Sequence, residues 1–175
     1  MKKIIFSAAV IIAVIIGCKT NSKSSDSKSL NLTFESKSSS NVTGTATFVE
    51  KNGKVTFTAK ISGLKPGIHA IHIHEKSDCS AADGSSAGGH WNPTFKKHGK
   101  WGDVEHHRGD IGNFTADEKG NGTITLTTDE WSIGGDDPAK DILGKGLIVH
   151  QGADDFVSQP AGNAGARVAC SAIIK

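Results

Sequence analysis

The chain has 175 residues, enough for one domain with appendages, and it combines 21 glycines with 4 prolines and no tyrosine. Helix-like apolar periodicity is scarce, so the composition argues against a helical bundle and favours a turn-rich β domain. The formal charge is only +2 and no long basic stripe is present, so we expect no nucleic-acid partner.

The N-terminal segment has the parts of a secretory signal. Lys2 and Lys3 precede an apolar run over residues 4–16, which Gly17 follows. The run is shorter than the roughly 20 residues that a membrane-spanning helix needs. We therefore predict that residues 1–17 are a signal peptide of the lipoprotein type. Its removal takes two positive charges away and leaves the chain formally neutral.

Cys18 is a candidate for lipidation. Residues 14–18 resemble a bacterial lipobox, although Ile15 and Ile16 depart from its usual pattern. A lipid on Cys18 would anchor the protein to a membrane and would explain an odd number of cysteines in an exported chain. The alternatives are a plain signal peptide with another cleavage site, or a retained anchor.

A short polar segment follows the cysteine. Residues 18–29 are rich in serine and lysine and contain no large apolar residue, so we expect a flexible tether. The tether would hold a folded domain, residues 30–175, close to a membrane face. The expected location is the bacterial cell envelope, in the periplasm or at the outer membrane.

From residue 30 onward, short alternating runs rich in threonine and β-branched residues are typical of strands. The predicted strands cover residues 30–35, 42–49, 55–61, 67–75, 111–116, 123–128, 147–151 and 166–174. Asn52 and Gly53 form a strong hairpin signal between the second and third strands. The pattern predicts an all-β fold, an eight-stranded antiparallel Greek-key sandwich or flattened barrel with two long functional loops.

Residues 76–110 and 152–165 interrupt this pattern. Both stretches are polar and lack a clear period, and loops of this length are uncommon in a compact domain unless they are functional. Most of the eight histidines lie in or beside these two stretches. The two loops are therefore where we expect the chemistry of the protein.

His72 and His74 lie two residues apart in the strand over residues 67–75. Residues i and i+2 of a strand point to the same face, so the two imidazoles project side by side from a rigid backbone. This arrangement suits a metal site, and it equally suits two hydrogen-bonded histidines in a half-buried strand. His69 has the opposite parity, and we assign it to a structural hydrogen bond.

Six stretches together make a more specific pattern. They are residues 69–75, 89–93, 97–99, 107–113, 149–155 and 162–170. In this order, they resemble copper/zinc superoxide dismutase over residues 30–175. The lengths of the loops after Cys79 and after Asp155 resemble the exported bacterial branch of that family.

The resemblance implies two metal sites that share one ligand. The copper ligands would be His72, His74, His90 and His150, and the zinc ligands would be His90, His98, His107 and Asp110. His90 would bridge the metals as an imidazolate, and no ligand position is missing. Imidazole nitrogens suit both Cu(II) and Cu(I), and Zn(II) accepts nitrogen and carboxylate ligands in a closed tetrahedral site. His106 is the competing candidate for the position of His107.

Other residues receive roles from the same resemblance. Asp154 would accept hydrogen bonds from one ligand of each metal; a solvated turn acid is the alternative. Arg167 would guide the anionic substrate toward copper; a surface arginine is the alternative. Cys79 and Cys170 would form an intrasubunit disulfide. Trp91, Trp101 and Trp131 are interpreted as packing residues.

The resemblance implies an enzyme that converts superoxide to dioxygen and hydrogen peroxide, as an antioxidant defence of the cell envelope. Copper would cycle between Cu(II) and Cu(I), and His90 would detach from reduced copper and hold a proton. The alternative is a non-enzymatic copper- and zinc-binding lipoprotein on the same fold. A homodimer is left open, because no motif marks an interface.

Overall fold

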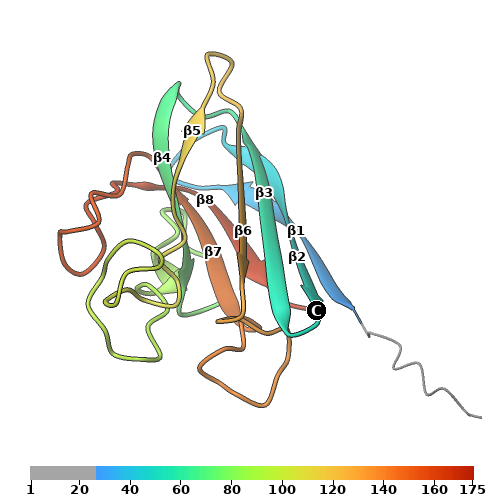
Figure 1. The fold of residues 1–175 in the computed structure, drawn as a ribbon. Coiled ribbons are helices and arrows are strands. Elements are labelled where there is room, and N and C mark those ends of the chain that lie inside the picture. The colour runs from blue at the N-terminus through green and yellow to red at the C-terminus, as the bar shows by residue number, and fades with distance from the viewer. Residues whose placement is uncertain (1–26) are drawn as a thin grey trace, which may run out of the picture.

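The computed structural model describes residues 27–175, so the predicted signal peptide, Cys18 and most of the tether lie outside the described residues. Eight antiparallel strands close into one barrel (Figure 1). The strands are β1 (Lys28–Ser36), β2 (Thr43–Lys51), β3 (Lys54–Ser62), β4 (Gly67–His74), β5 (Gly112–Ala116), β6 (Gly122–Thr128), β7 (Lys145–His150) and β8 (Arg167–Ile173). The predicted fold class is therefore confirmed, and each predicted strand is present.

The order of strands around the barrel is β1-β2-β3-β6-β5-β4-β7-β8, and pairing of β1 with β8 closes it. The β2–β3 hairpin turns at Asn52 and Gly53, whose φ angles of 54° and 73° are both positive. Both residue types tolerate this conformation, so the turn matches the right-handed twist of the flanking strands.

The core lies inside the barrel, where every second residue of a strand points. Phe48 and Phe57 of β2 and β3 are fully buried, and their ring centroids lie 4.9 Å apart. Trp131, from the loop after β6, packs edge-on against both rings at 6.0 and 6.2 Å. A closed barrel with a filled interior is a rigid support, so residues fixed to its outer face keep their positions.

Two long loops lie on the same side of the barrel, outside β4 (Figure 1). The first joins β4 to β5 and contains a short 3-10 helix, η1 (Ser85–Ala87); the second joins β7 to β8. A disulfide between Cys79 and Cys170, 91 positions apart, ties the first loop to β8. Closing a chain segment of this size stabilises the fold by about 4–5 kcal/mol in the chain-entropy description. Within residues 27–175, no helix has the length and apolar character to cross a membrane.

Candidate metal centre

Strand β4 supplies two histidines to the outer face of the barrel. Ile71 and Ile73 belong to the core, so the alternating His72 and His74 point the opposite way. The long loops cover them there, and their exposed fractions are only 0% and 1%. Two imidazoles are thus buried outside the barrel core, in a place that the loops create.

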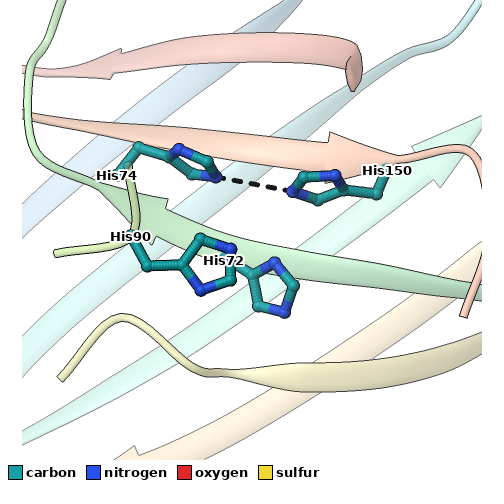
Figure 2. A group of neighbouring side chains, drawn as sticks. All are labelled: His72, His74, His90 and His150. Carbon is teal, nitrogen blue, oxygen red and sulfur yellow. Dashed lines mark hydrogen bonds between the residues drawn. The ribbon is translucent and has the colours of Figure 1, made fainter. Parts of the chain in front are cut away.

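Two further histidines reach the same place from other segments. His90 forms an isolated antiparallel bridge with His74, because the first loop folds back along the end of β4. His150 ends β7 and stands opposite Arg167 of β8, next to a register irregularity in the pairing. Figure 2 shows the four rings close together beside β4 and β7. Each of the four offers a nitrogen, and all of these nitrogens lie within 4.8 Å of one another.

The four-histidine group has ring nitrogens without protein partners. Nδ1 of His72 and Nε2 of His90 are buried and make no hydrogen bond, while Nε2 of His74 and Nε2 of His150 face each other at 3.4 Å. An unpaired buried nitrogen is costly. A metal ion bound by these nitrogens would remove that cost, so the donor set fits copper.

The second ring nitrogen of His72 and that of His74 are each fixed by a hydrogen bond. His72 donates its Nε2–H to Asp154 Oδ2 at 2.9 Å, and His74 donates its Nδ1–H to the Gly88 carbonyl at 3.0 Å. Each of these bonds fixes a tautomer, and so leaves the other nitrogen with a free lone pair. Burial, followed by the neighbouring histidines, keeps the pKa of His74 well below its usual value, which also favours the neutral ligand form.

A second group surrounds Asp110. His90 donates its Nδ1–H to Asp110 Oδ1 at 2.8 Å, and Nδ1 of His98 and of His107 lie 3.0 and 3.2 Å from the same carboxylate. Neither His98 nor His107 makes a hydrogen bond through that nitrogen. Three imidazoles and one carboxylate therefore converge on a common point, all four being buried. This donor set fits zinc.

The carboxylate of Asp110 is held in place by the main chain. It accepts hydrogen bonds from the amides of His107 at 2.8 Å and Gly99 at 3.2 Å. Burial would raise the pKa of Asp110, but the surrounding histidine rings, together with the main-chain amide of His107, outweigh burial and hold the pKa well below its usual range. The group therefore presents a fixed negative charge to a cation.

Two histidines of this second group have opposite charge preferences. Burial lowers the pKa of His90 to about 4, so its ring is neutral near pH 7. Burial acts in the same direction on His98, but the carboxylates of Asp110 and Asp154 outweigh it and raise the pKa of His98 to about 9. In the metal-free protein, a proton on His98 thus offsets part of the negative charge of the Asp110 and Asp154 carboxylates. A divalent cation bound there would do the same.

Asp154 connects the two groups. Its Oδ2 accepts from His72 and its Oδ1 accepts from Nε2 of His98, both at 2.9 Å. Asn113 of β5 pairs with the main chain of Asp154 through two hydrogen bonds of 2.8 Å. Gly162, at φ +65°, passes so close that a Cβ atom there would lie 1.8 Å from Asp154 Oδ1. The carboxylate is therefore fixed by its surroundings on several sides.

Arg167 lies beside the four-histidine group at a pocket of about 620 Å³ that His74, His90 and His150 also line. Its Nη1 donates to the Gly84 carbonyl and its Nη2 to the Gly88 carbonyl, both at 2.8 Å. The same Gly88 carbonyl accepts the hydrogen bond from His74. The guanidinium is thus held in one orientation at a pocket that reaches these histidines.

The remaining histidines lie outside both groups. His69 contacts the carbonyls of His150 and Lys65 through its two ring nitrogens, at 3.1 and 2.8 Å. His106 donates Nδ1–H to the Asp103 carbonyl at 2.7 Å and packs on Trp101. Of this neighbouring pair, His107 lies next to Asp110, whereas His106 lies outside the group around Asp110.

Sequence reasoning missed Asn113 and the carbonyl of Gly88. Asn113 lies inside one of the six stretches, but nothing in the pattern says that its amide pairs with Asp154. A carbonyl oxygen carries no residue-type signal, so the double acceptor role of Gly88 is visible only in the tertiary structure.

The fold and the site together define a β-barrel protein with two adjacent groups able to hold metal ions, joined through one histidine. Residues 42–173 match the family model of copper/zinc superoxide dismutase (SODC). The chain belongs to this family. It is also similar to a crystal structure described as that of the clock protein EA4, with a TM-score of 0.72 and 35% sequence identity. That similarity covers 83% of this chain and 94% of the other.

Proposed function

We propose that the protein converts superoxide to dioxygen and hydrogen peroxide, as the name of its family suggests. The observation that carries the proposal is that His90 belongs to both metal-binding groups. Its Nε2 is unpartnered in the four-histidine group, and its Nδ1 faces Asp110. If both groups held an ion, the position and the protonation of the His90 ring would link a redox-active site to a structural one.

His72, His74, His90 and His150 would hold copper, and His90, His98, His107 and Asp110 would hold zinc. When bound, copper supplies one-electron transfer in both directions, and zinc supplies a fixed positive charge. Production of hydrogen peroxide consumes two protons, and Nε2 of His90, which has no protein partner, is the atom at which one of them would be held.

Arg167 supports the same proposal from the pocket side. Its guanidinium is always charged and is fixed by two carbonyls, so it would attract a small anion toward the histidines without reorganising. A surface arginine with a freely rotating side chain would not provide such a fixed field. Lys96 and Lys97, both exposed, also line this pocket and add positive charge to its wall.

The alternative is a protein that binds copper and zinc without catalysis. The similar solved structure is described as a clock protein, a description that states no catalytic activity, and a fold does not determine a function. The presence of every expected ligand together with Arg167 favours the enzyme. We also propose that the protein is exported and anchored in the cell envelope through Cys18, on the basis of the signal and lipobox patterns.

Metal analysis and a superoxide dismutation assay on the same sample test the proposal. One copper and one zinc per chain with rapid dismutation would support the enzyme. Both metals without dismutation would support the metal-binding alternative, and a chain that binds neither would exclude both functions.

A further inference from the structure

Gln159 belongs to the loop between β7 and β8, yet its side chain bonds to the main chain of the other loop. Its Oε1 accepts the N–H of His98 at 2.9 Å, and its Nε2 donates to the carbonyl of His98 at 3.0 Å. One side-chain amide thus satisfies both the main-chain N–H and the main-chain carbonyl of a single residue, as a paired residue on a neighbouring strand would.

The amide group of Gln159 has no spare donor. The second hydrogen of Nε2 is directed to the carbonyl of Val157 at 3.2 Å, within the same loop. The opposite orientation of the amide would face two N–H groups toward each other and two oxygens toward each other, so the network fixes the orientation. The bonds are therefore specific to an amide of this length.

His98 is consequently held by the second loop at three points. Gln159 holds its N–H and its carbonyl, and Asp154 holds Nε2 of its ring at 2.9 Å. The remaining ring nitrogen, Nδ1, then lies 3.0 Å from Asp110. Asp154 sets the rotation of the ring, whereas Gln159 sets the position of the backbone from which the ring projects.

We propose that Gln159 is a positioning residue for zinc, which holds the backbone of His98 so that Nδ1 stays directed into the group around Asp110. The inference rests on the zinc assignment of the proposed function. It adds a residue of the second loop to the retention of a metal whose ligands all come from the first loop. Because Gln159 also lines the pocket that contains Arg167, the same contact connects zinc retention to the wall of that pocket.

Two variants separate the hydrogen bonds from simple packing. Gln159→Ala removes both bonds to His98. Gln159→Glu keeps the size and the acceptor for the N–H of His98, but it places a carboxylate oxygen against the carbonyl. Asn163→Ala is the matched control, because Asn163 bonds to Ser158 at 2.8 Å and Asp155 at 3.3 Å within the same loop and makes no bond to His98.

The measurement is the rate at which zinc passes from the loaded protein to a coloured chelator, with copper release followed on the same sample. We expect zinc release to be about tenfold faster in both Gln159 variants, as for other residues that orient metal ligands. Zinc release in Asn163→Ala and copper release in all variants should stay close to the unsubstituted protein. A general loss of stability would accelerate the release of both metals.

Equal zinc release rates in Gln159→Ala, Gln159→Glu and the unsubstituted protein would overturn the inference and leave the zinc site in place. Equal acceleration of copper and zinc would also overturn it, since Gln159 would then act on the whole fold. An unsubstituted protein that takes up no zinc would overturn the metal assignment of the proposed function and, with it, this inference.

Discussion

His72 and Asp154 form a buried hydrogen bond of 2.9 Å, and the second oxygen of that carboxylate accepts from His98 at the same distance. His72 belongs to the four-histidine group and His98 to the group around Asp110. A single carboxylate therefore orients one ligand in each group. Both side chains and the acid are buried, so water does not compete for these bonds.

Replacement of Asp154 by asparagine is expected to weaken metal binding. An amide has one oxygen and one NH₂ group, so it cannot accept from both His72 and His98, and one ring loses its orientation. We expect a 10- to 100-fold loss of affinity for at least one metal, measured by competition with a chelator. Asp155→Asn is the control, because Asp155 is an exposed neighbour. Equal affinities in the two variants would contradict this role.

His150→Ala is expected to abolish dismutation while zinc stays bound. His150 contributes to the four-histidine group and not to the group around Asp110, so its loss removes a ligand from only one site. Copper and zinc content and the dismutation rate are measured on the same preparation. Dismutation that persists in this variant would contradict the assignment of His150 as a copper ligand.

Arg167→Ala is expected to lower kcat/KM by about tenfold and to weaken its dependence on salt, because a fixed charge at the pocket steers the anion. The rate is measured over a range of ionic strength. Lys119→Ala removes the same charge from an exposed turn between β5 and β6 and should leave the rate unchanged. Identical salt dependence in the Arg167 variant and the unsubstituted protein would count against steering.

Zinc affinity of the metal-free protein is expected to rise with pH. The pKa of His98 is raised to about 9, so the proton stabilises the folded chain below the ordinary histidine pKa, and that contribution is lost as pH rises through 9. Zinc must displace this proton, which gives about a tenfold gain in affinity per pH unit below the pKa. Zinc titrations at neutral and alkaline pH test the slope. An affinity independent of pH would refute the competition.

Cys18→Ala is expected to release the protein from membranes. Without the thiol no lipid can be attached, so the proposed anchor is lost. Fractionation of cells and the mass of the N-terminal peptide give the result, with Ser22→Ala as control. Membrane association that survives the loss of Cys18 would exclude lipidation as the anchor.

Local pattern was sufficient to predict the strands and the direction of some side chains. The alternation of β4 separates Ile71 and Ile73 from His72 and His74 because successive side chains of any strand point to opposite faces. The Asn52–Gly53 turn follows from the ease with which both residues adopt a positive φ. The order of the six stretches was sufficient to indicate the family.

Only the tertiary structure decides which residues of the two loops meet. Gln159 and His98 are 61 positions apart, and neither residue type nor spacing indicates that an amide of one loop pairs with the main chain of the other. The sequence likewise does not tell which nitrogen of each histidine ring is left free to bind a metal. That depends on the hydrogen-bond partner of the other nitrogen, such as Asp154 for His72 or Gly88 for His74. Periodicity acts between neighbours in the chain, whereas these partners are brought together only by the tertiary structure.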